Sequence, residues 1–105
     1  MIETLENIKE AIRRRIDNIN FIPYFYSKFK ERPYLSEELI KNTLNKYENY
    51  LGLQEENIKG VIRYRIGIEL SGKYTLVVVM EIDKEHLNII TAWKTNRKWQ
   101  KAMQK

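Results

Sequence analysis

Apolar residues recur every three or four positions at the start of the chain, which is the period of one stripe of an amphipathic helix. The pattern predicts a first helix over about residues 3–18, with a stripe of Leu5, Ile8, Ile12, Ile16 and Ile19. The opposite face carries Lys9, Arg13 and Arg14, which are typical of a solvated surface and equally suit contact with a partner.

A second helix is predicted from Ser36 to about residue 50. Ser36 offers a side-chain oxygen to the free amides, and Glu37 and Glu38 favour the positive end of the helix dipole. Gly52 is well placed to end this helix, and residues 53–59 are expected to form a polar connection. The apolar stripe consists of Ile40, Leu44, Tyr47 and Leu51.

The segment between the two predicted helices, residues 20–35, is rich in aromatic residues and contains Pro23 and Pro33. Each proline limits helix formation around it, so we expect a bent connector with one short helical turn. Most of its rings are expected in the core, because aromatic side chains dominate burial in small domains. Tyr26, beside Ser27 and Lys28, is the ring expected to face a ligand.

The hydrophobic period changes to two after Gly60, which indicates strands. Three strands are predicted over residues 61–70, 74–82 and 87–94, joined by tight turns into an antiparallel meander. The predicted fold class is α+β, with two N-terminal helices packed on one face of an antiparallel sheet of three or four strands. We expect one domain over residues 1–105, divided into a helical half (1–52), a meander (60–94) and a basic tail (95–105) for which a helix is one option.

Composition narrows the class of protein. The chain has 105 residues, 43% of them hydrophobic and 31% charged, which suits one folded globular domain. It contains no cysteine, so disulfides, thiolate metal sites and cysteine nucleophiles are excluded. No apolar run approaches the roughly 20 residues that cross a bilayer, so no membrane association and a cytoplasmic location are expected.

The net charge of +5 is concentrated at the C-terminal end. Residues 94–105 contain five bases and no acid, and taking these five from the 19 bases leaves 14, which equals the number of acids. A localised excess attracts phosphates, although a solvated tail that improves solubility is the alternative. The bases are Lys94, Arg97, Lys98, Lys101 and Lys105.

Aromatic rings are interleaved with these bases. Trp93 precedes Lys94, and Trp99 follows Lys98. Such a pattern suits single-stranded RNA, because cations hold the backbone while rings stack on unpaired bases. Alternatively, Trp99 packs back onto the domain together with Met103. The residues predicted to bind nucleic acid are Tyr26, Trp93, Lys94, Arg97, Lys98, Trp99 and Lys101.

Two arginines form the main candidate for chemistry. Arg63 and Arg65 are two positions apart in a predicted strand, so they point to the same face of the sheet. Two adjacent guanidiniums require a negative group nearby, which is either Glu69 or Glu81 in a structural ion pair, or a bound phosphate.

The single histidine, His86, lies in a predicted turn with Asp83 and Glu85. This pattern is typical of polar turn chemistry rather than of metal ligands. No metal site and no cofactor are predicted.

Several segments together resemble a known group of proteins. They are YSKFKER, the helix LSEELIKNTL, the strand RYRIGIEL, the strand YTLVVVMEI that follows the hairpin, and the ending NIITAWKTNRKW. This order is similar to RelE- and BrnT-type small toxin domains of the barnase, EndoU, colicin and RelE group. The resemblance implies a metal-independent endoribonuclease, often held inactive by an antitoxin protein, in which the RNA 2′-hydroxyl attacks the adjacent phosphate.

The resemblance also implies roles for particular residues. Arg63 or Arg65 would hold the scissile phosphate, and Thr91 would hydrogen-bond it or orient a neighbour. Lys28 and Arg32 occupy a His-x-x-x-Arg spacing, with lysine in the histidine position. This is a departure from the pattern, because an ordinary lysine stays protonated near neutral pH and acts as a base only if its pKa is lowered.

A tyrosine is one candidate for the proton donor. Tyr26 or Tyr64 would act as the acid, although Tyr64 is predicted on the core-facing side of its strand.

Two other classes of function stay open. A nucleic-acid-binding module without catalytic activity would use the same basic tail and rings. A protein-interaction domain would use the first helix and an open sheet face, where Val77, Val79 and Ile89 or Ile90 form an apolar patch that suits a partner or a homodimer.

Overall fold

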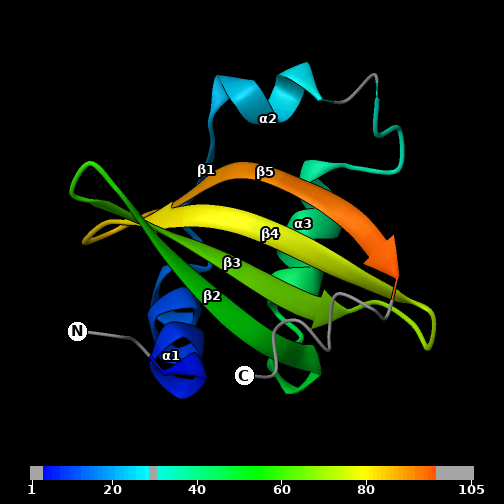
Figure 1. The fold of residues 1–105 in the computed structure, drawn as a ribbon, viewed down its shortest axis with the longest axis horizontal. Coiled ribbons are helices and arrows are strands. Elements are labelled where there is room, and N and C mark those ends of the chain that lie inside the picture. Colours follow the sequence, from blue (N-terminus) through cyan, green and yellow to red (C-terminus); the bar gives the residue numbers. More distant parts are fainter. Residues whose placement is uncertain (1–3, 29–30, 97–105) are drawn as a thin grey trace.

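The computed structural model describes residues 4–28 and 31–96. Figure 1 shows α1 and α3 together on one side of a twisted sheet, and α2 beside β1 and β5. The elements in chain order are α1 (Leu5–Arg15), β1 (Ile19–Phe21), α2 (Pro23–Ser27), α3 (Glu37–Leu44), the 3₁₀ helix η1 (Tyr47–Asn49), β2 (Tyr50–Ile58), β3 (Val61–Glu69), β4 (Tyr74–Ile82) and β5 (Leu87–Asn96).

The sheet has five strands in the order β1-β5-β4-β3-β2. The pairs from β2 to β5 are antiparallel, and β1 runs parallel to β5. The α+β class and the meander β3-β4-β5 are therefore confirmed. The predicted number of three or four strands was wrong, because β2 and β1 flank the meander and make the sheet mixed.

The strand β2 replaces the predicted polar connection over residues 53–59. Its sequence does not alternate cleanly, because a bulge between Tyr50 and Gly52 inserts one residue, so that Tyr50 and Leu53 both contact the core. Its second half, Gln54 to Asn57, is polar because β2 is an edge strand. These residues have only a weak local preference for a strand, and pairing with β3 makes them one.

The strand β1 was also missed, since it contains only three residues, Ile19–Phe21, inside the predicted connector. It pairs with Leu87–Ile89 of β5, a partner nearly 70 residues away that no local pattern reveals. The expected short helical turn is present as α2, which begins at Pro23. The predicted helical half therefore contains β1 and the start of β2.

The two main helices are confirmed, although both are shorter than predicted. Thr4 caps α1, which ends at Arg15 rather than near residue 18. The Ser36 side chain accepts a hydrogen bond from the Leu39 N–H, which confirms the predicted start of α3.

The end of α3 differs more clearly from the prediction. The helix ends at Leu44, and Gly52 lies inside β2 rather than ending the helix. The buried Tyr50 hydroxyl donates to the Leu44 carbonyl oxygen at 2.8 Å, so a side chain from β2 satisfies a carbonyl at the helix end.

One hydrophobic core fills the space between the sheet and its two helices. Alternate residues of β3 and β4 point into it, which confirms the predicted core face of β3. Full burial of each large aliphatic side chain contributes roughly 1.5–3 kcal/mol. The buried cluster contains Ile8, Ile12, Phe25, Leu35, Ile40, Leu44, Tyr50, Ile66, Ile68, Leu76, Val78, Met80, Leu87, Ile89 and Ala92.

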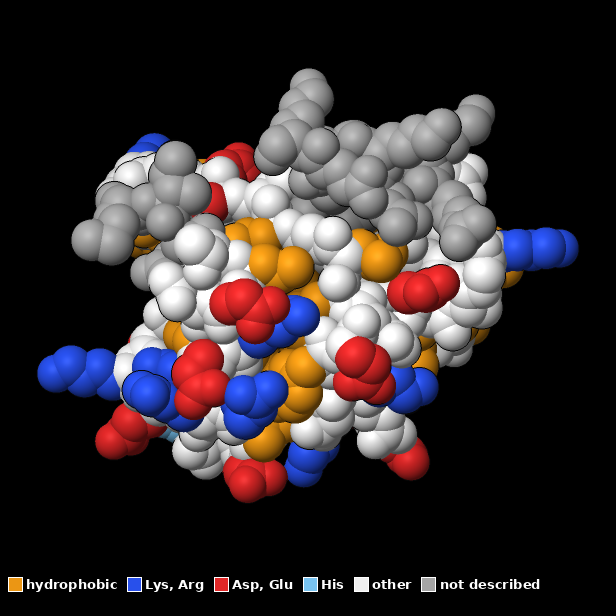
Figure 2. Space-filling view, turned by 90° about the horizontal axis from the view of Figure 1, so that it is seen from below, with side chains coloured by type: hydrophobic (Ala, Val, Ile, Leu, Met, Phe, Trp, Pro, Cys, Tyr) orange, Lys and Arg blue, Asp and Glu red, His pale blue; other side chains and the backbone are white. Residues whose placement is uncertain are grey.

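The exposed face of α1 carries paired charges. Lys9 contacts Glu6 at 3.3 Å, and Arg13 and Arg14 both contact Glu10, at 2.8 and 3.3 Å. Figure 2 shows basic and acidic side chains interspersed with hydrophobic ones on the side of the molecule seen from below. A face of mixed sign does not attract a polyanion as a run of bases does.

Within residues 4–28 and 31–96, no helix is long and apolar enough to cross a membrane. The cytoplasmic location stays a prediction.

Candidate functional site

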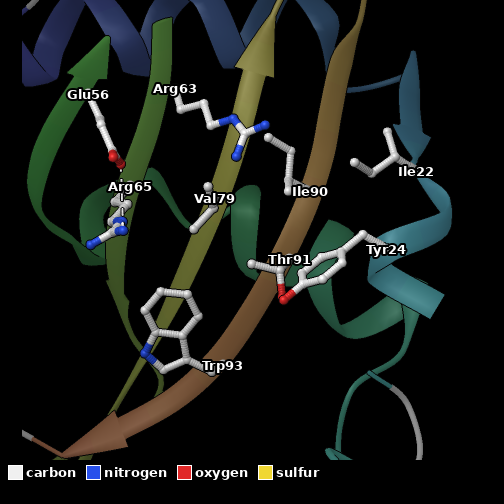
Figure 3. Close-up of a pocket in the computed structure, with 9 residues that line it drawn as sticks. All are labelled: Ile22, Tyr24, Glu56, Arg63, Arg65, Val79, Ile90, Thr91 and Trp93. Carbon is white, nitrogen blue, oxygen red and sulfur yellow. Dashed lines mark ion pairs between the residues drawn. The ribbon is translucent and has the colours of Figure 1, made fainter. Parts of the chain in front are cut away.

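A cavity of about 400 Å³ opens on the face of the sheet opposite α1 and α3. Figure 3 shows that its lining comes from β2, β3, β4, β5 and the start of α2. Apolar side chains and charged groups share the lining, which is the usual make-up of a binding pocket. The lining residues are Ile22, Tyr24, Glu56, Arg63, Arg65, Val79, Ile90, Thr91 and Trp93.

A bulge in β5 places three of the lining residues, Ile90, Thr91 and Trp93, at the cavity. Val79 pairs with Thr91 and Met80 pairs with Ile89, so Ile90 is the extra residue. Without the bulge, strict alternation would place Thr91 on the same face as the buried Ile89. The bulge reverses the phase of the strand, so that Ile90, Thr91 and Trp93 all line the cavity.

The two arginines of β3 lie side by side in the cavity, as predicted, and each has a carboxylate partner. Arg63 Nε lies 3.1 Å from Glu81 Oε2, and Arg65 Nη2 lies 3.5 Å from Glu56 Oε2. The structure thus selects Glu81, rather than Glu69, as the partner of Arg63. Arg65 Nε is buried and has no hydrogen-bond partner among the described residues. A buried donor without a partner is costly, which favours an acceptor at this position.

Arg32 and Thr91, separated by 59 positions, are joined by a hydrogen bond. Arg32 Nη1 donates to Thr91 Oγ1 at 2.9 Å and to the Ala92 carbonyl oxygen at 3.2 Å. Nearby, the Lys94 N–H donates to the Tyr34 hydroxyl at 2.9 Å. Arg32 and Tyr34 therefore satisfy polar groups along β5 beyond the end of β1, where β4 is the one described strand that pairs with β5.

Lys28 lies near the cavity but does not line it. Its ammonium contacts Glu31 at 3.3 Å and sits 5.3 Å from the centre of the Tyr24 ring. Tyr24 does line the cavity, so Lys28 contacts one of the lining residues without being one itself.

Trp93 and Lys94, both predicted to bind nucleic acid, lie on opposite faces of β5. Trp93 lines the cavity, whereas the ammonium of Lys94 lies between two exposed rings, 4.9 Å from the centre of Tyr34 and 4.7 Å from that of Tyr74. Lys94 pairs with the core residue Leu76, so it belongs to the opposite face of β5 from Trp93.

Tyr26 does not reach the cavity. Its hydroxyl lies 3.1 Å from Glu37 Oε2, and its ring packs against Phe21 and Phe25. Partial burial and the hydrogen bond to Glu37 raise the pKa of Tyr26 above its usual value. Tyr64, the other candidate acid, packs against the core, as predicted.

The remaining residues predicted to bind nucleic acid, Arg97, Lys98, Trp99 and Lys101, lie outside the described residues.

Sequence reasoning missed three residues of the cavity, Ile22, Tyr24 and Glu56. Glu56 was placed in a loop, although its spacing of two from Gln54 would have put both on the open face of a predicted strand. Nothing in the sequence near Tyr24 distinguishes it from the neighbouring rings.

His86 lies apart from the cavity, in the turn between β4 and β5. Its Nδ1 is 3.4 Å from Asp83, which also accepts the backbone N–H groups of Glu85 and His86 and a bond from Asn88. These bonds lower the pKa of Asp83 to about 2. Among the described residues, no group of three or more acidic or histidine side chains is arranged to hold a metal ion.

Comparisons with protein-family models, with curated proteins and with solved structures gave no match for this chain.

Proposed function

We propose that the cavity binds a phosphate of single-stranded RNA and that the protein is a metal-independent endoribonuclease of the RelE or BrnT type. The observation that carries this proposal is the β5 bulge, which turns Thr91, with Arg32 bound to it, onto the same face as Arg63 and Arg65. Two guanidiniums from β3 and a hydroxyl from β5 thus converge on one concave site, and Arg32 holds that hydroxyl from outside the lining. Guanidinium groups match phosphate oxygens in both charge and geometry.

The proposed chemistry is attack by an RNA 2′-hydroxyl on the adjacent phosphorus, which forms a 2′,3′-cyclic phosphate and releases a 5′-hydroxyl. Negative charge builds up on the phosphate oxygens during this step, and preorganised cations stabilise it. Arg63 and Arg65 are suited to this role, and the Trp93 ring offers a surface on which an unpaired base stacks.

Binding of RNA without cleavage is the second candidate, because Arg63 and Arg65 are both paired with carboxylates. A phosphate must compete with Glu81 and Glu56 for the two guanidiniums, so the net positive charge at the cavity is small. Lys28, in the histidine position of the resembling proteins, is itself engaged by Glu31.

An antitoxin protein is part of the proposal. Such a partner, or a second copy of the chain, would inhibit cleavage by covering the cavity.

The deciding experiment incubates the protein with a mixed-sequence single-stranded RNA in EDTA and records both retention of RNA and the fragment ends. The matched variants are Arg65→Ala and Arg14→Ala, the latter an exposed arginine of α1 that is also paired with a carboxylate. Fragments with 2′,3′-cyclic phosphate ends that disappear in Arg65→Ala and persist in Arg14→Ala would support the nuclease. Salt-sensitive retention of intact RNA would support the binding module.

If the protein neither retains nor cleaves RNA, both candidates are wrong and the protein-interaction domain becomes the working hypothesis. Its first test is capture of a partner by the cavity face, with Trp93→Ala as the disrupting variant.

A further inference from the structure

The hydrogen bond between Arg32 and Thr91 determines the direction in which Thr91 can donate. A guanidinium has only donor groups, so Thr91 Oγ1 is the acceptor in this 2.9 Å bond. The Thr91 hydroxyl keeps its own proton, and among the described residues no bond that uses this proton is present. Because Thr91 lines the cavity, the proton is available to a ligand there.

The same contact fixes Arg32. Its Nη1 also donates to the Ala92 carbonyl oxygen at 3.2 Å, so this nitrogen is engaged by both β5 residues. Arg32 does not itself line the cavity, whereas Thr91 does. A charged donor polarises the hydroxyl that accepts from it, which makes the Thr91 O–H a stronger donor than an isolated threonine hydroxyl.

We infer that the Thr91 hydroxyl donates a hydrogen bond to an oxygen of the bound phosphate, and that Arg32 is a positioning residue that acts through Thr91 rather than on the RNA. This inference rests on the proposed function and deepens it. Of the two roles that the family resemblance leaves open for Thr91, direct contact with the phosphate is selected. Arg32 is accordingly not one of the residues that touch the RNA.

The assignment accounts for the position of the β5 bulge. The bulge places Thr91 Oγ1 on the cavity face while the adjacent Ala92 remains buried in the core, with its carbonyl oxygen within reach of Arg32. One arginine thereby fixes both the backbone and the hydroxyl of this part of the strand.

The test is a double-mutant cycle with Arg32→Ala and Thr91→Val, in which valine keeps the shape of threonine and removes the hydroxyl. Cleavage is measured on single-stranded RNA, and affinity is measured on the 2′-O-methyl form of the same sequence, which cannot be cleaved through its 2′-oxygen. Thr91→Ser, which retains a hydroxyl, is the conservative control, and unfolding of every variant is followed by urea denaturation.

We expect each single substitution to lower kcat about tenfold, and the double variant to lose no more than the larger single loss, because both remove the same interaction. Thr91→Ser should retain most of the activity. If Arg32→Ala costs a further tenfold in the Thr91→Val background, Arg32 contacts the RNA or acts structurally, and the inference is wrong. A merely structural role would reduce activity equally in both backgrounds.

The outcomes separate this inference from the proposed function. If the protein binds 2′-O-methyl RNA but cleaves no RNA, the nuclease is wrong, and the same cycle read in affinity still decides whether Arg32 acts through Thr91. If the protein binds neither the unmodified RNA nor its 2′-O-methyl form, both proposals are wrong. Cleavage that is insensitive to Thr91→Val would leave the nuclease standing and overturn the role of Thr91.

Discussion

The two faces of the sheet use the same strands for different purposes. On β3, Ile66 and Ile68 are fully buried beneath the helices, while Arg63 and Arg65 point into the cavity on the other face. The core under α1 and α3 is built from hydrophobic side chains, mostly aliphatic with several aromatic rings, whereas the opposite face combines charged pairs with Val79, Ile90 and Trp93. Period-two alternation lets one strand pack its apolar side chains in the core and present charged side chains to the cavity at the same time.

This separation predicts that substitutions on the two faces have different consequences. Changes beneath the helices should alter the free energy of unfolding and affect RNA only through loss of the fold. Changes in the cavity should alter binding or cleavage with little effect on stability.

The largest expected effect on stability comes from Ile66→Ala. Ile66 is completely buried, so its truncation leaves a cavity that the surrounding core only partly fills. We expect the free energy of unfolding to fall by about 2–5 kcal/mol in urea denaturation. A loss below about 1 kcal/mol would show that the helices do not pack tightly on this face.

The matched substitution on the other face is Arg65→Ala. Its ion pair with Glu56 joins side chains that are 43% and 49% exposed, and exposed pairs contribute only about 0–1 kcal/mol. We expect a small change in stability and a loss of at least about tenfold in RNA affinity or cleavage. Titration with labelled RNA measures this loss, and a drop in stability comparable to that of Ile66→Ala would break the distinction between the faces.

Two neighbouring tyrosines beneath α1 give a finer comparison. Their rings lie 5.7 Å apart, but the Tyr50 hydroxyl donates to the Leu44 carbonyl oxygen, whereas the buried Tyr47 hydroxyl has no partner among the described residues. Tyr50→Phe should destabilise the protein by about 1 kcal/mol or somewhat more, because the carbonyl loses its donor. Tyr47→Phe should be neutral or stabilising. Thermal unfolding of both variants tests this, and equal losses would contradict it.

The smallest expected effect on stability comes from Asp83, which lies in the turn between β4 and β5 and belongs to neither face of the sheet. The pKa of Asp83 is lowered to about 2 by the backbone N–H of Glu85, the Asn88 side chain and the backbone N–H of His86. Because the pKa in the folded state lies below the unfolded value of 3.8, ionised Asp83 contributes stability above about pH 4. That contribution is lost as the pH falls from about 4 to about 2.

Asp83→Asn should therefore flatten the dependence of the free energy of unfolding on pH between about pH 4 and about pH 2. Near pH 7 the substitution should not change this dependence. Urea denaturation at a series of pH values makes the comparison, with Glu85→Gln in the same turn as the control. Parallel curves for Asp83→Asn and the parent protein would contradict the assignment.

Much of the sheet face under α1 and α3, and the helices themselves, could be predicted from local sequence. The period of Ile8 and Ile12, the cap at Ser36 and the alternation of β3 each indicate the correct element, because each depends on interactions within a few residues. The flanking strands could not be predicted in this way. The edge strand β2 is polar and bulged, and the three-residue β1 forms only because β5 lies beside it.

The candidate site was predicted in part. That Arg63 and Arg65 share a face follows from strand geometry alone, and Arg32 and Thr91 were named as candidates because of the resemblance to toxin domains. The ion pairs with Glu81 and Glu56, and the contribution of Tyr24, depend on strand order and on α2, which local patterns do not reveal.

The sequence by itself determined the α+β class, the three-stranded meander and the part of each apolar stripe that lies inside α1 or α3, because these follow from periodicity and capping within short segments. Only the tertiary structure decided the parallel β1–β5 pair, the edge strand β2 and the bulge at Ile90. The reason is physical, since strand pairing and bulges depend on partners that are distant in the chain. The Arg32–Thr91 contact exists because the bulge turns Thr91 away from the core and toward the cavity.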